Sequence, residues 1–127
     1  MKINFDSLVP VYMQIAEAIE DDIIRGDLVE GGAAYSQLLI ARELSVNPAT
    51  AAKGINVLVA KGILDKQRGA SMTVASGATE RLIKERHEKN FMGLVSELVS
   101  EANKIMLTEG EVIAEIRKHY EKIVEQA

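Results

Sequence analysis

The chain has 127 residues, 47% of them hydrophobic and 27% charged, which suits one compact domain or a small domain with an appendage. It contains no cysteine, so disulfides and cysteine-based metal or redox sites are excluded, and the reducing cytoplasm is the expected location. The sequence has no apolar run long enough to span a bilayer, and residues 1–6 lack the apolar core of a signal peptide. We therefore expect a cytoplasmic protein with no membrane partner.

Positive charge is concentrated in the middle of the chain. The formal net charge is −4, but residues 34–75 carry five Lys or Arg against two Asp or Glu, a local charge of +3. Residues 1–33 carry −5 and residues 76–127 carry −2. Because local charge sets the potential that a phosphate backbone meets, the middle segment is the candidate surface for a nucleic acid.

The first strong pattern is an amphipathic helix over residues 10–25. Apolar residues recur at three- and four-residue spacing from Tyr12 to Ile23, and acidic residues occupy the other side. Gly26 is a typical C-terminal stop. A turn signal follows at 30–32, and we expect a short extended segment after it.

Two short helices with a tight turn between them come next. Ser36 is a suitable N-cap for a helix over 37–44, and Asn47 followed by Pro48 is a strong start for a second helix that ends near Lys61. Two short helices joined by a three- or four-residue turn form a helix-turn-helix motif, whose second helix reads DNA. The expected outer residues of that second helix are Ala49, Thr50, Ala52, Lys53 and Asn56.

The hydrophobic period changes after the second of these helices. Residues 63–67 and 72–74 are typical of two short strands, and the small residues at 68–71 are typical of the turn between them. A β-hairpin in this place is a wing. The predicted fold class for residues 1–76 is therefore a winged helix-turn-helix, mainly α with a small β-hairpin.

A small-residue hinge near Gly77 precedes a wholly helical region over residues 77–127. Apolar spacing predicts one long helix over about 79–106, and Thr108 with Glu111 forms a capping box before a last helix. Two helices are too few to bury both of their apolar faces, so the apolar stripe packs on the other domain or on a second chain. We interpret this region as a two-helix dimerisation or effector region.

The element order and three motifs resemble the GntR family of bacterial transcription regulators. The resemblance covers residues 9–75 and rests on Val-Pro-Val-Tyr-x-Gln-Ile at 9–15, Ala-x-Glu-Leu-x-Val-Asn-Pro-x-Thr at 41–50, and Gly-Ile-Leu before Arg-Gly at 62–69. The short helical tail resembles the YtrA-like branch, whose tails serve dimerisation. The resemblance implies a homodimer that binds a near-palindromic operator in double-stranded DNA, with repression as the expected effect.

The resemblance also assigns residues to the DNA interface. In the family, the second helix of the motif enters the major groove and the wing tip approaches the minor groove. By position, Ser36 matches a phosphate contact at the start of the first helix, and Lys53 matches a basic position on the second. The implied DNA-binding residues are Ser36, Asn47, Pro48, Ala49, Thr50, Lys53, Arg68 and Gly69.

The chain departs from the family pattern at two informative positions. Leu38 stands where the family usually has an arginine that contacts DNA, and Ser71 stands where the wing usually has a glycine. An arginine–guanine contact is worth about 1–3 kcal/mol of base discrimination, so a different operator, weaker binding or reliance on backbone contacts is expected. Either Leu38 or Leu39 should lie near the surface, against a thymine methyl group or against the C-terminal region.

Other function classes have less support in the sequence. His87 and His119 are the only histidines and fall on different predicted helices, so we expect neither a metal nor a cofactor. No phosphate loop, nucleophile elbow or catalytic triad pattern is present, so we expect no enzyme. The alternative is a winged-helix protein-interaction or dimerisation module with decayed DNA readout. A small-molecule effector of unidentified class stays open as a further partner.

Overall fold

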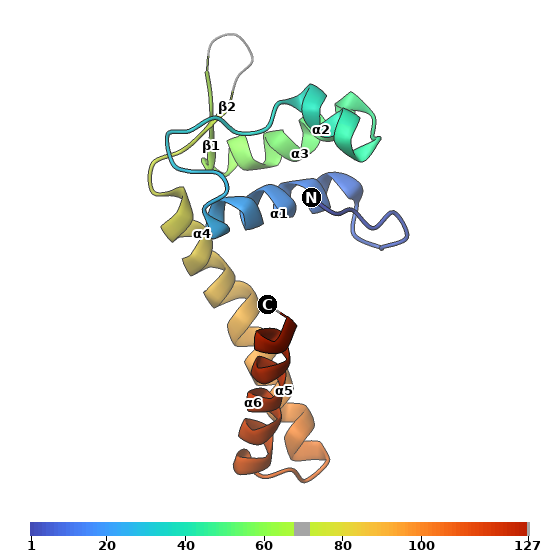
Figure 1. Cartoon of the computed structure of the whole chain (residues 1–127), viewed down its shortest axis with the longest axis vertical. Helices are drawn as coiled ribbons and strands as arrows, with labels where there is room; N and C mark the ends of the chain where they lie inside the picture. The colour runs from blue at the N-terminus through green and yellow to red at the C-terminus, as the bar shows by residue number, and fades with distance from the viewer. Residues whose placement is uncertain (68–71, 127) are drawn as a thin grey trace. The chain divides into compact units, whose positions relative to one another are not determined.

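The computed structural model describes residues 1–67 and 72–126, which fall into two compact units, Met1–Lys84 and Glu85–Ala127 (Figure 1). The predicted fold class, a winged helix-turn-helix followed by helices, is confirmed. The first unit extends past the hinge expected near residue 77, because Ala78 and Leu82 are buried in its core. The division into domains at 1–76 and 77–127 stays a prediction.

Three helices build the core of the first unit. Helix α1, Val11–Arg25, ends at Gly26, which has a left-handed φ of +88° as its place in the sequence predicts. Helices α2, Gln37–Leu44, and α3, Pro48–Ala60, follow as the predicted helix-turn-helix. The fully buried side chains of these helices include Ile15, Ile19, Ile23, Ile40 and Leu58.

Helices α1 and α3 lie side by side (Figure 1), and Gly54 of α3 lies against the backbone of α1. A Cβ atom at Gly54 would lie 2.8 Å from the carbonyl oxygen of Tyr12 and 2.9 Å from Cγ2 of Ile15. Any larger side chain would therefore push the two helices apart. This close approach fixes how α3 sits on α1.

The wing is a two-stranded antiparallel hairpin. Strands β1, Leu64–Lys66, and β2, Met72–Val74, pair with Leu64 opposite Val74. The extended segment expected after the 30–32 turn runs along the other edge of β2, where Gly31 N donates to Val74 O at 2.8 Å. Backbone pairing on both edges of β2 thus ties the base of the wing to the chain that leaves α1.

Helix α4, Ala78–Arg86, follows the hairpin in the sequence, and its residues up to Lys84 belong to the first unit. Its Arg81 guanidinium donates to Lys61 O at 2.7 Å and to Gly62 O at 3.1 Å. These carbonyls lie just beyond the last turn of α3, where the helix dipole favours a cation. Arg81 therefore ties α4 to the C-terminal end of α3.

The second unit is built from helices alone in the residues that the structure describes. The π-helical segment η1, His87–Phe91, leads into α5, Met92–Lys104, and α6 follows over Glu109–Gln126. The single helix predicted over about 79–106 is thus present as α4, η1 and α5 in succession, with a π-helical interruption that the apolar spacing does not predict.

The capping box before α6 is confirmed. Thr108 N donates to Glu111 Oε1 at 3.1 Å, and Glu111 N donates to Thr108 Oγ1 at 3.2 Å. Each side chain thus satisfies a backbone N–H that the helix start leaves without a partner.

Among the residues that the structure describes, no helix combines the length and the apolar character that a membrane span requires.

Candidate nucleic-acid interface

The turn between α2 and α3 is short and locally fixed. Helix α2 ends at Leu44, the next residue Ser45 turns the chain with a φ of +53°, and Val46 N donates to Ala41 O at 3.0 Å. Asn47 lies two residues after Ser45 and caps α3, since its Oδ1 accepts a hydrogen bond from Ala49 N at 2.8 Å. The predicted N-cap of the second helix is therefore confirmed.

The first two turns of α3 present a surface of small and polar side chains. Asn47, Pro48 and Ala49 are exposed, while Thr50 is half-buried because it lies at the edge of the face that packs on the core. Lys53 is exposed and is the single charged residue of α3. An exposed helix start with little bulk is suited to close approach to another surface.

Ser36 occupies the start of α2, where its Oγ accepts a hydrogen bond from Leu39 N at 3.1 Å. The hydroxyl keeps its own O–H to donate, which a phosphate oxygen could accept. The predicted cap is confirmed, and it leaves the hydrogen-bonding capacity that a phosphate contact needs.

The two leucines that follow Ser36 have different surroundings. Leu38 is 72% exposed, and Leu39 is half-buried. Leu38 is therefore the residue that lies at the surface, at the position where the resemblance implies an arginine. The surface of α2 carries an apolar side chain there in place of a cation.

The tip of the wing lies outside the described residues, and with it Arg68, Gly69 and Ser71. The strand ends on either side are described. Lys66 and Gln67 are exposed, and Gln67 Nε2 donates to Thr73 Oγ1 across the hairpin at 3.2 Å.

Lys53 lies against an aromatic ring from α1. Its Nζ stands 4.1 Å from the centroid of the Tyr12 ring, a cation–π geometry. Lys61, at the end of α3, has a different environment, because its Nζ pairs with Glu20 Oε2 at 2.7 Å. Lys61 therefore supports the contact between α3 and α1, whereas Lys53 keeps an exposed charge.

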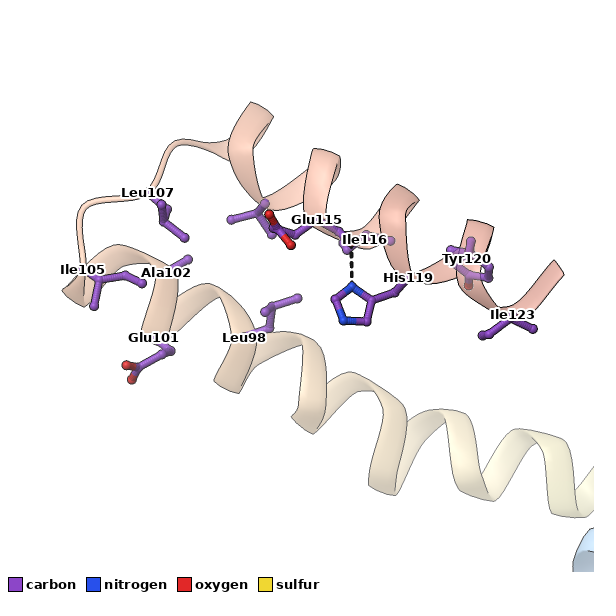
Figure 2. Close-up of a pocket in the computed structure, with 11 residues that line it drawn as sticks. Leu98, Glu101, Ala102, Ile105, Leu107, Glu115, Ile116, His119, Tyr120 and Ile123 are labelled. Atoms are coloured by element: carbon purple, nitrogen blue, oxygen red, sulfur yellow. Dashed lines mark hydrogen bonds between the residues drawn. The ribbon is translucent and has the colours of Figure 1, made fainter. Parts of the chain in front are cut away.

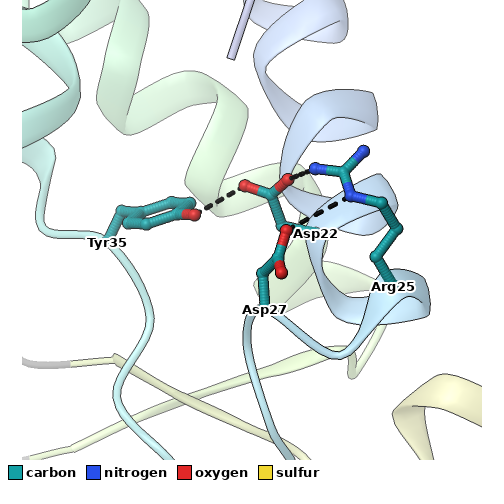
Figure 3. A network of polar contacts seen from close by, with 4 residues as sticks. All are labelled: Asp22, Arg25, Asp27 and Tyr35. Carbon is teal, nitrogen blue, oxygen red and sulfur yellow. Dashed lines mark hydrogen bonds and ion pairs between the residues drawn. The ribbon is translucent and has the colours of Figure 1, made fainter. Parts of the chain in front are cut away.

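A polar network orients the chain just before α2 (Figure 3). The Tyr35 hydroxyl donates to Asp22 Oδ2 at 2.6 Å, and Arg25 pairs with Asp22 and with Asp27. The hydrogen bond to Asp22, partial burial and the nearby carboxylates raise the pKa of Tyr35 to about 12. Tyr35 immediately precedes Ser36, so the network holds the start of α2 to the end of α1.

Sequence reasoning missed the supporting roles of Tyr12, Tyr35 and Arg81. Each contacts a residue far away in the chain, and Tyr12 reads as an ordinary member of an apolar stripe. Only the position of Tyr35 beside the Ser36 cap could have drawn attention to it. No group of acidic or histidine side chains among the described residues is arranged to hold a metal ion.

Comparisons with known proteins agree with this architecture. A GntR family transcriptional regulator from Listeria monocytogenes is 26% identical, with a TM-score of 0.72 over 90% of this chain and 98% of that one. A GntR family regulator from Bacteroides thetaiotaomicron is 29% identical, with a TM-score of 0.62 over 91% and 97% of the two chains.

A curated relative of this chain is also named as a helix-turn-helix transcriptional regulator. The HTH-type transcriptional regulator YhcF of Bacillus subtilis (strain 168) is 26% identical over 114 residues, which is 90% of this chain and 93% of YhcF. No protein-family model matches the chain. The capped helix-turn-helix and the hairpin after it form the fold of these relatives, and the chain is similar in sequence, fold and extent to transcriptional regulators of the GntR family.

Proposed function

We propose that this chain is a DNA-binding transcriptional regulator of the GntR family, which represses transcription by binding a near-palindromic operator as a homodimer, with α3 of each copy in the major groove. The observation that carries the proposal is the start of α3. Asn47 caps it, Pro48 begins it, and the side chains around it are exposed within the one segment of positive local charge. A helix presented in this way is the reading element of helix-turn-helix proteins.

The proposed contacts divide into two kinds. Ser36, Lys53 and Arg68 are suited to phosphate oxygens, which fix the position of the protein on the duplex. Asn47 and Thr50 are suited to base edges, where sequence is read. Because α3 itself has no arginine, the proposal favours a binding mode in which phosphate contacts supply most of the affinity.

The second unit supports the homodimer. Among its described residues, Ala102 alone is buried, although α5 and α6 are strongly amphipathic. A groove of about 390 Å³ runs between the two helices, with Leu98 on one wall and Ile116 on the other (Figure 2). Further exposed apolar side chains of these helices include Leu94, Val95, Ile113, Tyr120, Ile123 and Val124.

The same face of a second copy is the occupant that we propose for this apolar surface. An isologous contact buries two equal apolar faces at once and brings two reading heads into one molecule. Monomeric proteins rarely leave so large an apolar surface in water. The short helical tail also supports placing the chain in the YtrA-like branch, which the resemblance implies.

Regulation would follow from dimer geometry. An effector that changes the spacing or orientation of the two α3 helices would change how many contacts form together, and with them the operator affinity. The direction of control, repression, is the expected direction for this family.

Selection of operators from random double-stranded DNA tests the proposal. The purified full-length protein should enrich a motif with two related half-sites, and its affinity should fall steeply with salt, with a slope near −0.9 per neutralised phosphate. Enrichment no greater than that of a protein-free control would favour the alternative, a winged-helix interaction module whose DNA readout has decayed.

A further inference from the structure

We propose that Tyr12 is a positioning residue for DNA binding, because its ring holds the Lys53 ammonium at the surface of α3 in a place where it can meet a phosphate. The inference rests on the proposed function and adds to it a residue of α1 that lies outside the helix-turn-helix motif. Tyr12 belongs to a different helix from every residue that the resemblance assigns to the DNA interface.

Helix packing creates the contact. Gly54 lies against the backbone of α1, since a Cβ there would lie 2.8 Å from Tyr12 O. Lys53 directly precedes Gly54 in α3, so the close packing that Gly54 permits also brings Lys53 onto the Tyr12 ring, with Nζ 4.1 Å from the centroid. The half-buried ring is held by the helix that carries it and offers a fixed face to a flexible side chain.

A ring is a different kind of partner from a carboxylate. An ion pair such as Lys61–Glu20 cancels the charge of the lysine, whereas a cation–π contact holds the ammonium and leaves its positive charge in place. Within the described part of the chain, Lys53 makes no ion pair. The ammonium is therefore oriented and still able to bind an anion.

The position matters because α3 has no other charge. A lysine side chain loses considerable rotamer freedom when it binds, and a side chain already held in place loses less. Lys53 supplies the whole ionic attraction of α3 toward a phosphate backbone. Tyr12 would then lower the ordering cost of the one ionic contact that the recognition helix can make.

The contact can be tested first in the free protein. Proton NMR should show the ε-methylene protons of Lys53 shifted upfield by the Tyr12 ring current. The shift should persist in Tyr12→Phe, which keeps the ring, and disappear in Tyr12→Leu. An unshifted Lys53 resonance in the wild-type chain would overturn the inference, whatever the protein does with DNA.

The functional consequence can be tested by a double-mutant cycle on the enriched operator. Tyr12→Leu should weaken binding about threefold to fivefold, and Tyr12→Phe should stay within twofold of wild type. In a Lys53→Gln background, Tyr12→Leu should have no further effect, because the cation that the ring holds is gone. In a Lys66→Gln background, Tyr12→Leu should weaken operator binding by the same factor as in the wild-type chain, because Lys66 is an exposed cation on β1 rather than on α3.

The outcomes separate this inference from the proposed function. Operator binding by the wild-type chain with independent effects of Tyr12→Leu and Lys53→Gln would overturn the positioning role and leave the regulator intact. Failure of the wild-type chain to bind any duplex would overturn both. Thermal unfolding of each variant checks that the binding assay is run well below its unfolding transition. If Tyr12→Leu disturbs the packing of α1 against α3, Tyr12→Phe still provides a variant that preserves it.

Discussion

Individual polar side chains of this chain support the candidate nucleic-acid interface more than they form it. Tyr35 is the clearest case, because its hydroxyl binds Asp22 while its backbone leads directly to the Ser36 cap (Figure 3). The carboxylate of Asp22 is buried and accepts from both Tyr35 and Arg25. Removing one donor leaves part of a buried charge without its partner, which is costly.

Tyr35→Phe should therefore lower the free energy of unfolding by about 1–2 kcal/mol at neutral pH. The pKa of Tyr35 in the folded chain is about 12, above the ordinary 10.0, so the contribution is complete below about pH 10 and is lost as the pH rises toward 12. Urea unfolding of both proteins at pH 8 and pH 11.5 measures the difference. A difference that grows at the higher pH would contradict the assignment.

A substitution at Leu38 tests for a gain of operator affinity rather than a loss. Its side chain is 72% exposed on α2 at the position where the family usually has arginine. Leu38→Arg should raise operator affinity roughly tenfold and increase the preference for guanine at one position in each half-site. The matched control is Val29→Arg, which adds the same charge at an exposed apolar position outside α2 and α3.

Binding titrations with the enriched operator and with a scrambled duplex distinguish the outcomes for Leu38. Equal gains for the Leu38 and Val29 variants would mean that added charge, and not its position on α2, is responsible.

Among the elements, the proposed recognition helix α3 packs against α1 at Gly54. Gly54→Ala would gain helix propensity but place a methyl group against Tyr12 O and Ile15. Overpacking of this kind costs about 1–3 kcal/mol, so we expect a net loss of stability and weaker operator binding. Gly93→Ala in α5 is the control, because a Cβ there meets no described atom within 4 Å, and it should raise stability by about 0.5–1 kcal/mol.

Thermal unfolding and operator titration of the two alanine variants test this comparison. A stabilised Gly54→Ala protein with wild-type operator affinity would show that α3 does not need its close approach to α1.

Local elements of this chain could be predicted from the sequence because their causes are local. Asn47 and Ser36 cap helices with hydrogen bonds to residues two and three positions ahead, and Thr108 does the same with Glu111. Gly26 ends α1 through its own backbone conformation. These interactions need no knowledge of the rest of the fold.

The contacts that support the interface could not be predicted in the same way. The ring under Lys53 and the guanidinium at the end of α3 come from other helices, and only the packing of those helices brings them together. The π-helical segment His87–Phe91 likewise interrupts a stretch whose apolar spacing indicates an ordinary helix. The residues assigned to DNA from the family resemblance, Arg68 and Gly69 among them, stay predictions.

For the whole molecule, the proposed mode of operator binding requires two copies to be held together. Leu98 lines two grooves between α5 and α6 and is 45% exposed, so it should contact the second copy without being needed for the fold of its own chain. Leu98→Glu would bury a charge in the proposed interface. We expect a monomer with much weaker operator binding and an intact first unit.

Sedimentation velocity and circular dichroism test this prediction. Leu8→Glu is the control, because Leu8 is fully exposed in the segment before α1, and this variant should stay dimeric. A dimeric Leu98→Glu protein would place the interface elsewhere.

The spacing of the two half-sites tests the central claim most directly. Two α3 helices in one dimer should read half-sites whose centres lie about one turn of DNA apart, ~10 base pairs or a multiple of this spacing. Inserting about 5 base pairs between the half-sites turns one of them to the opposite face of the duplex, so the affinity of the wild-type chain should fall to the level of a single half-site. Equal affinity for the original and the lengthened operator would contradict binding by a homodimer through paired recognition helices.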